Sequence, residues 1–384
     1  MNQLSLDTTQ IELPPPVFDE EKRGNIIRKK RFRLRDVAGQ ILKDWRVHAC
    51  GKKPIGNDVA IVVGVDRGAY TAGVETCGSV WACPVCAGKV AERRRADIEA
   101  VMKAHRAAGG DIWMMTLTVP HNEFQAAGML RKVVSKAWTK MVSGNPWKRK
   151  RAQFGLDFIK ALEATRGASG WHPHMHIALL TDSLTTAEKI HLKAWLFHRW
   201  SVIVRRLGLL APSRRAFDFQ KAENVNAVGD YIGKWGADCE LAKATTKISK
   251  KGGRSPWQLL ADAGEGDTKA LFLFREYAHA FKGARHLTWS RGLRERYLEE
   301  PELSDVELAM QDSPYAGDTA IGLLRRDLWF RILKNKLVPD LLDVAEEEGW
   351  SGVLRFLRGN HLALPENCFG GDPNAIENRI SNPM

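Results

Sequence analysis

The sequence lacks an apolar run of about 20 residues, the length that a bilayer-spanning helix requires. Its N-terminal region also lacks the apolar core of a secretory signal. Cysteine and tyrosine are scarce, with six and five residues in a chain of 384. These features argue against a membrane protein and against a secreted protein held together by disulfides. They predict a soluble protein of the cytoplasm.

Acidic residues are scarce in most of the chain. The net charge is +13, but residues 299–384 contain 8 Lys and Arg against 16 Asp and Glu, which leaves +21 for residues 1–298. A basic body with an acidic tail predicts nucleic acid as the partner of the body, and a solvated basic surface is the alternative. The same two interpretations apply to the basic run within residues 22–43, which contacts DNA phosphates or faces solvent.

The cysteines that are present are unevenly placed. Four of the six fall close together in the sequence: Cys50, Cys77, Cys83 and Cys86. Thiolates at such spacing in a cytosolic protein predict a tetrahedral zinc site, with His48 as a possible substitute ligand. The alternative is a set of reduced, buried thiols. Cys239 and Cys368 stand apart and are interpreted as packing residues.

Two histidines separated by one apolar residue lie in the apolar run 170–180. On a strand, His174 and His176 share a face while Met175 points the other way. Glu163 ends a second predicted strand, residues 156–163, and the segment 166–170 supplies the turn between the two. Two imidazoles and a carboxylate on neighbouring strands can bind one divalent cation. Histidines paired by chance on a strand are the alternative.

The remaining pattern predicts an α+β fold with an antiparallel sheet and helices packed on it. After a helix over 87–107, the order is strand, helix, strand, strand, helix, strand and helix. The segments are 112–120, 124–142, 156–163, 170–180, 183–207, 216–220 and 225–245. Phe272 and Phe274 predict a further strand.

Tyr231 and Lys234 lie three residues apart on the last of these helices, so they share a face. A phenol is a poor nucleophile at neutral pH, and a nearby ammonium favours its phenolate form. The alternative is a half-buried tyrosine that packs beside a solvated lysine.

Three segments together resemble the motifs of the plasmid rolling-circle replication initiators: residues 115–120 (MTLTVP), 172–177 (HPHMHI) and 231–235 (YIGKW). These initiators belong to the endonucleases named for a His-hydrophobic-His pair. The cysteine segment also resembles that family, so the resemblance covers roughly residues 45–298. It implies that His174 and His176 bind metal, that Tyr231 is the nucleophile, and that Lys234 is its neighbour. Glu163 as third ligand rests on its position before the histidine strand.

The sequence departs from the family at one position. Some relatives have a glutamate one helical turn before the tyrosine, proposed to activate water in the terminating cleavage, and here that residue is Ala227. Asp230 or Glu223 would have to replace it, or another mechanism applies.

The resemblance implies a site-specific single-strand DNA endonuclease and strand transferase that nicks a plasmid origin through a 5′-phosphotyrosine intermediate. It further implies Mg²⁺ or Mn²⁺ at the histidines beside structural Zn²⁺. The expected partners are single-stranded or extruded origin DNA, a host helicase and a DNA polymerase. A relaxase or transposase with the same chemistry is the alternative, as is a non-catalytic zinc-containing DNA-binding protein.

These interpretations divide the chain into four parts. They are a disordered N-terminus (1–20), a basic arm with the cysteine-rich zinc-binding segment (21–110), a nuclease domain (111–298) and an acidic helical appendage (299–384). Because phosphates repel the appendage, deletion of residues 300–384 is expected to spare the nicking of an oligonucleotide. If Tyr231 is not the nucleophile, Tyr277 is the next candidate.

Overall fold

The computed structural model describes residues 20–64, 68–222, 253–298, 302–310, 318–362 and 370. Within them lie two wholly antiparallel sheets and the helices that cover them, so the predicted α+β class is confirmed. The predicted disorder of the N-terminus concerns residues that are almost all outside this set. None of the described helices is both long and apolar enough to cross a membrane.

The larger sheet has the strand order β6-β3-β5-β4-β7. Its strands are β3 (Asp111–Thr118), β4 (Asp157–Gly167), β5 (Gly170–Thr181), β6 (Phe217–Lys221) and β7 (Leu287–Trp289). The two long strands β4 and β5 form a hairpin with a two-residue turn, and Gly170 begins β5 with a φ of +101°. A Cβ at that glycine would lie 2.4 Å from the carbonyl oxygen of Asn122, so glycine is required there.

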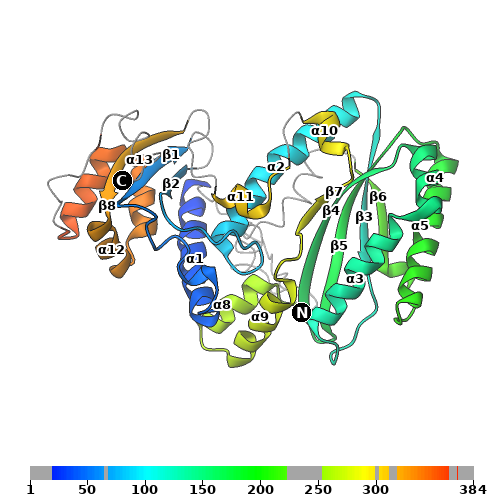
Figure 1. Ribbon diagram of the computed structural model, residues 1–384, viewed down its shortest axis with the longest axis horizontal. Coiled ribbons are helices and arrows are strands. Elements are labelled where there is room, and N and C mark those ends of the chain that lie inside the picture. Colours follow the sequence, from blue (N-terminus) through cyan, green and yellow to red (C-terminus); the bar gives the residue numbers. More distant parts are fainter. Residues whose placement is uncertain are drawn as a thin grey trace, which may run out of the picture.

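Helices cover both faces of this sheet (Figure 1). On one face lie α3 (Ala127–Met141), α4 (Gly144–Phe154) and α5 (Thr186–Arg206), which pack against Met175, Ile177 and Leu179. On the other face α2 (Pro84–Ala107) and α10 (Leu293–Tyr297) pack against Ala178 and Leu180. Because successive side chains of β5 point to opposite faces of the sheet, they pack in two separate cores, one on each face.

The start of α5 follows from its sequence. Thr185 accepts a hydrogen bond from the backbone N–H of Glu188, and the Glu188 carboxylate accepts one from the backbone N–H of Thr185. This reciprocal capping box satisfies two N–H groups that the first turn would leave unpaired. The helix predicted to begin at residues 183–186 is therefore confirmed.

The strand predicted from Phe272 and Phe274 is wrong. Both residues lie in α9 (Thr268–Phe281), which follows α8 (Pro256–Gly264) and begins at an Asp267 cap. Phe274, Ala278 and Phe281 are buried at helical spacing, whereas Phe272 is 54% exposed. The two aromatic residues match a strand pattern only when the longer helical period is ignored.

A second, smaller sheet joins distant parts of the chain. Its order is β2-β1-β8, formed by β1 (Asp58–Gly64), β2 (Gly68–Ala72) and β8 (Thr319–Arg325). The helices α12 (Arg326–Lys334) and α13 (Val338–Gly359) pack on it. The segment after residue 299 was expected to be helical, but β8 is a strand because β1 provides its hydrogen-bonding partner.

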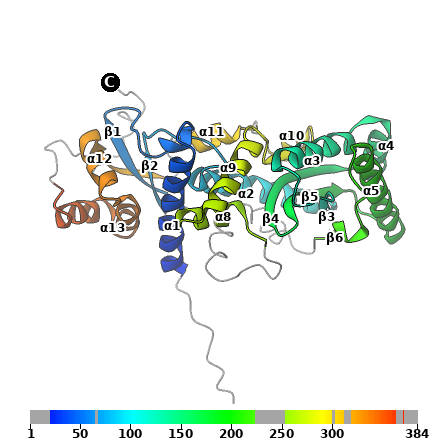
Figure 2. The ribbon, with the colours of Figure 1, turned by 90° about the horizontal axis from the view of Figure 1, so that it is seen from below.

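The basic run lies in α1 (Glu20–Ile41), which lies between the small sheet and α8 in both views (Figures 1 and 2). Arg28 forms ion pairs with Asp343 and Glu346 of α13, and Lys29 lies 2.6 Å from Asp340. The Arg28 side chain is 16% exposed, so it is neither free for DNA nor solvated, whereas Lys29 is 52% exposed and keeps contact with solvent within its ion pair. They hold the acidic C-terminal helix against α1.

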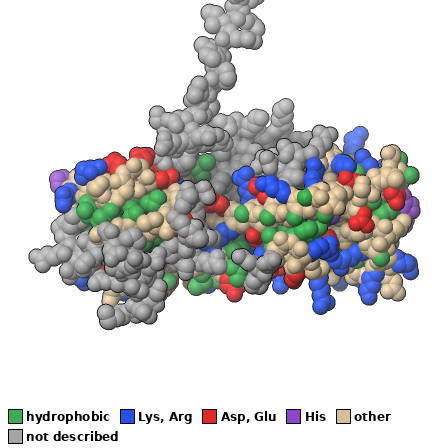
Figure 3. All heavy atoms as spheres, turned by 90° about the horizontal axis from the view of Figure 1, so that it is seen from above, with side chains coloured by type: hydrophobic (Ala, Val, Ile, Leu, Met, Phe, Trp, Pro, Cys, Tyr) green, Lys and Arg blue, Asp and Glu red, His purple; other side chains and the backbone are tan. Residues whose placement is uncertain are grey.

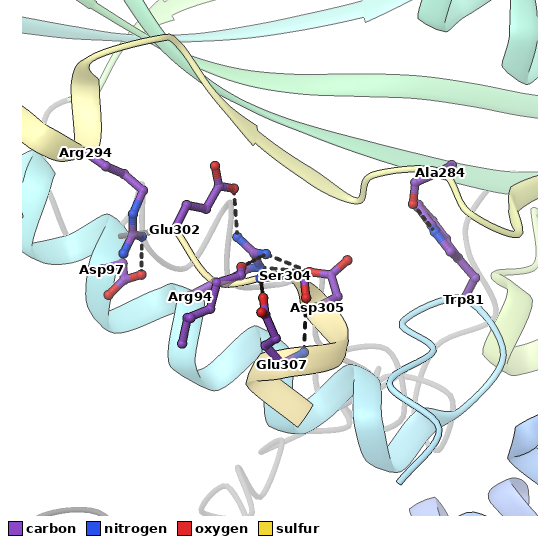
Figure 4. Close-up of polar contacts among 10 residues, drawn as sticks. Trp81, Arg94, Asp97, Ala284, Arg294, Glu302, Ser304, Asp305 and Glu307 are labelled. Atoms are coloured by element: carbon purple, nitrogen blue, oxygen red, sulfur yellow. Dashed lines mark hydrogen bonds and ion pairs between the residues drawn. The ribbon is translucent and has the colours of Figure 1, made fainter. Parts of the chain in front are cut away.

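The acidic segment 302–310 docks on α2, around α11 (Asp305–Met310) (Figure 4). The Arg94 guanidinium, with a side chain only 7% exposed, lies 2.7 Å from the Asp305 carboxylate and 3.7 Å from that of Glu302. The segment walls a hollow of about 700 Å³ that Trp81 and Ala284 also line. Arg94 thus neutralises acidic residues of this chain.

Deletion of residues 300–384 is consequently expected to destabilise the protein, contrary to the expectation from sequence. It would remove β8, α12 and α13 and uncover Val59 and Ile61, which are fully buried. Each such side chain contributes about 1.5–3 kcal/mol by its burial. Thermal denaturation should show a lower melting temperature for the truncated protein, or it should be insoluble. An unchanged melting temperature would contradict the docking of the C-terminal part.

Candidate functional site

Glu163, His174 and His176 converge on the face of the larger sheet that α2 partly covers. Glu163 on β4 is paired directly with His174 on β5, and His176 is paired with Ala161. The Nε2 atom of His174 lies 3.1 Å from Oε2 of Glu163, and Nε2 of His176 lies 3.6 Å from the same oxygen. The hairpin register therefore brings together the three residues that the sequence singled out.

The other ring nitrogens of the two histidines have their own partners. Nδ1 of His174 lies 3.0 Å from the backbone oxygen of His172, and Nδ1 of His176 lies 3.2 Å from Oγ1 of Thr116 on β3. A carbonyl oxygen can only accept, so Nδ1 of His174 carries a hydrogen. Such outer contacts orient imidazoles that bind metals through Nε2.

The arrangement fits a cation. If His174 is neutral, its Nε2 is an acceptor that faces the carboxylate oxygen of Glu163, and two acceptors at 3.1 Å need a positive charge between them. Either a proton on the ring or a divalent metal supplies that charge. One carboxylate oxygen and two imidazole nitrogens form a donor set for a divalent cation with positions left for other ligands.

The carboxylate of Glu163 is suited to act as a ligand. Burial raises its pKa, but hydrogen bonds from His174 and His176 outweigh this effect and hold the pKa well below its usual range. The side chain is 22% exposed. Burial also lowers the pKa of His172 to about 4, aided by the neighbouring His174 and His121. At neutral pH Glu163 is therefore ionised and His172 is uncharged.

The four clustered cysteines meet at a second place. Cys50 follows a short 3₁₀ turn, η1 (Arg46–His48), Cys77 precedes α2, Cys83 caps α2, and Cys86 lies in its first turn. The sulfur of Cys86 lies 3.5 Å from that of Cys50 and 3.6 Å from that of Cys77. The sulfurs of Cys50 and Cys83 are 3.8 Å apart. Four thiolates at a Zn–S distance of about 2.3 Å would be separated by about 3.8 Å, so the cluster has dimensions suitable for zinc.

Backbone N–H groups point at these sulfurs. The N–H groups of Cys77, Ser79 and Cys86 lie 3.4–3.5 Å from the sulfurs of Cys50, Cys77 and Cys83, respectively. Hydrogen bonds from the Cys77, Cys83 and Cys86 thiols lower the pKa of Cys50 despite its burial. His48 is not part of the group, which consists of the four cysteines, and its Nδ1 lies 3.1 Å from the backbone oxygen of Gly39.

Tyr231, Lys234, Asp230, Ala227 and Glu223 lie outside the described residues, as do Cys239 and Cys368.

The alternative nucleophile, Tyr277, is described. It is 3% exposed on α9 and packs against the rings of Trp81, Trp171 and Phe281. Its position is that of a core residue, which makes it poorly suited to attack DNA.

The sequence did not identify Thr116 as a partner of the site. The residue lies within the predicted strand 112–120, and its polar side chain among apolar neighbours was the available signal. Its contact depends on the register that sets Thr116 opposite His176, which a single sequence does not reveal.

Comparisons with known proteins place the chain in a family. A family model described as "Replication protein" matches residues 71–322. "Protein rep" of Streptomyces lividans is 26% identical, in an alignment that covers 73% of this chain and 76% of that protein. The "Neomycin resistance protein" of Streptomyces cyanogenus is 26% identical, in an alignment that covers 32% of this chain and 34% of that protein. No solved structure matches.

Proposed function

The chain belongs to the replication protein family of plasmid replication initiators, and on that premise we propose that it is a site-specific nickase of single-stranded DNA. It would act as endonuclease and strand transferase at a plasmid origin and start rolling-circle replication. The observation that carries the proposal is the convergence of Glu163, His174 and His176 on one point of the sheet. Membership of the family alone would not specify this chemistry.

In the proposed reaction, the phenol oxygen of Tyr231 forms a bond to the scissile phosphorus while the bond from phosphorus to the 3′ oxygen breaks. The phenol loses its proton and the departing 3′ oxygen gains one, which leaves a 5′-phosphotyrosyl link and a 3′-hydroxyl primer. Lys234 would favour the phenolate by its charge. Asp230 or Glu223 would be the base that activates water in the terminating cleavage.

Glu163, His174 and His176 would hold and orient the scissile phosphate through a divalent cation, for which Mg²⁺ or Mn²⁺ is proposed. Such an ion supplies positive charge to the non-bridging phosphate oxygens. Thr116 and the backbone oxygen of His172 would fix the two imidazole rings in the orientation that this task requires.

The cysteine cluster is proposed to hold structural zinc. It contributes to the same core as the helices that cover the sheet, which suits a structural role. A non-catalytic zinc-containing DNA-binding protein would also have such a cluster but would not require the Glu163 and histidine group. Relaxase or transposase activity would use the same residues, and the replication family favours initiation. Origin DNA, a host helicase and a DNA polymerase are the proposed partners, in the cytoplasm.

The metal requirement tests this proposal. Single-stranded oligonucleotides tiled across the DNA beside the gene identify a cleaved substrate, and its nicking rate is then measured against Mn²⁺ concentration. Glu163→Gln and His174→Ala are expected to need at least about tenfold more Mn²⁺, because outer-shell changes alone cost about 10- to 100-fold in metal affinity. Traces of activity should remain at high Mn²⁺, since the nucleophile is intact.

His198→Ala is the matched control, because His198 is an exposed histidine of α5 outside the candidate site. It should show the metal dependence of the unaltered protein. Equal metal dependence of all three variants would contradict the role proposed for Glu163 and His174.

A further inference from the structure

The helices α3, α4 and α5 have a strongly asymmetric charge. Together they contain thirteen Lys and Arg residues and a single acidic residue, Glu188. Lys and Arg side chains gather at the right-hand end of the molecule in Figure 3, the end at which α4 and α5 lie in Figure 1. Such a concentration of one sign attracts a polyanion.

These cations are largely uncompensated by the rest of the described chain. Within the described residues, Arg151 is the only one of the thirteen in an ion pair, at 2.6 Å from Asp157. Lys150 contacts no carboxylate: its Nζ lies 2.8 Å from Oε1 of Gln153 and 2.8 Å from Nε2 of His191. This contrasts with Arg28 and Arg94, whose charges are matched by carboxylates.

The basic helices lie across the sheet from the Glu163 and histidine site. Leu130 of α3 and Leu196 of α5 pack in the core that contains Met175 and Ile177. Alternation along β5 directs His174 to the opposite face. A ligand on the outer surface of these helices therefore does not occupy the candidate active site.

The aromatic residues of α3, α4 and α5 indicate which form of nucleic acid fits. Single strands are bound by exposed rings on which bases stack, and duplexes through phosphate contacts. On these three described helices no Trp, Tyr or Phe ring is exposed: Trp138, Trp147, Phe154 and Trp200 are buried and Phe197 is half-buried. The exposed rings are the smaller imidazoles of His191 and His198. The half-buried Trp195 has the Arg199 guanidinium over its ring, at 5.5 Å. A surface that offers many cations but no exposed Trp, Tyr or Phe ring for base stacking favours the binding of a duplex.

A hollow of about 440 Å³ lies beside α4 at the edge of this surface. Its lining includes the cations of Lys148, Arg151 and Arg296 and the carboxylate of Asp157. That carboxylate is held by both arginines and by the hydroxyl of Ser290 at 2.7 Å. Three cations against one anion leave net positive charge, which suits a backbone phosphate.

We propose that the outer surface of α3, α4 and α5 is a docking surface for double-stranded DNA, separate from the site that acts on the single strand. The proposal rests on the proposed function only for the choice of DNA as the polyanion. Duplex beside the origin binds to one side of the protein, and the Glu163 and histidine site lies on the opposite face of the sheet.

The double variant Lys148→Ala/Arg149→Ala tests this surface, because both side chains are exposed and make no described ion pair. Binding of a fluorescent duplex from the DNA beside the gene is measured between about 50 and 200 mM salt. With a salt slope of about −0.9 for each phosphate contact, loss of two contacts should reduce the slope by about 2. If the two proteins bind equally at about 1 M salt, this difference in slope corresponds to about 30-fold weaker binding by the variant at about 150 mM salt.

Arg331→Ala/Lys334→Ala on α12 is the matched control, with two exposed cations removed from the other end of the molecule. It should bind duplex like the unaltered protein. Nicking of a single-stranded oligonucleotide, at saturating concentration, should be unchanged in both variants.

Unaltered duplex affinity and salt slope in Lys148→Ala/Arg149→Ala would overturn the docking surface, as would an equal loss of duplex and single-strand binding. The duplex measurement does not require cleavage. A protein that binds duplex as expected but nicks no DNA would contradict the proposed function and leave the docking surface supported.

Discussion

Tyr231→Phe is expected to abolish both nicking and the covalent protein–DNA adduct while folding and DNA binding persist. Phenylalanine keeps the ring and its packing but lacks the oxygen that must attack phosphorus. No other group is proposed to replace that oxygen, so activity should fall below detection even at high Mn²⁺. Incubation with the cleaved single-stranded oligonucleotide, followed by a denaturing gel, shows the adduct as a shifted band.

Tyr277→Phe is the matched control, because Tyr277 is a tyrosine buried in an aromatic core. It should still form the adduct. An adduct formed by Tyr231→Phe would assign the nucleophile to another residue. His174→Ala should behave differently from Tyr231→Phe, since it removes a ligand and retains the attacking oxygen.

Cys83→Ser is expected to remove bound zinc and to unfold a large part of the protein. Cys83 is fully buried, and its sulfur lies within a cluster that packs in the main core. Structural zinc contributes an apparent free energy of about 10–16 kcal/mol in small zinc domains, comparable with the whole stability of a domain. Elemental analysis should find about one zinc per unaltered chain, retained after mild chelation that removes Mg²⁺.

Cys368→Ser serves as the control, because this cysteine is interpreted as a packing residue outside the cluster. It should retain zinc and the melting temperature of the unaltered protein. A freshly reduced, unaltered protein without zinc would exclude the site. Cys83→Ser with its full zinc content would instead remove Cys83 from the ligand set.

Local patterns made several elements predictable. The run 112–120 matches β3, and the strand pattern around His174 matches β5, because alternation of buried residues depends only on neighbouring positions. The start of α5 was predictable for the same reason, since its Thr185 cap is a local sequence signal. Glu163 could be placed near the histidines because a short turn connects their strands and limits the possible registers.

Contacts between distant segments were not predictable. The strand β8 forms only because β1, more than 250 residues earlier, offers its edge. The cations of α1 were interpreted without knowledge of α13, whose Asp343 pairs with Arg28. Thr116 lies at the candidate site because β3 pairs with β5 and sets Thr116 opposite His176. In each case the physical partner is remote in sequence, and periodicity contains no information about it.

The most direct test of the proposed nickase is to identify the residue that becomes bonded to DNA. The unaltered protein is incubated with the cleaved oligonucleotide and Mn²⁺, the adduct is digested with nuclease and protease, and the modified peptide is sequenced by mass spectrometry. The account predicts a nucleotide linked by its 5′ phosphate to Tyr231. A link to any other residue, or complete cleavage without an adduct, would contradict it.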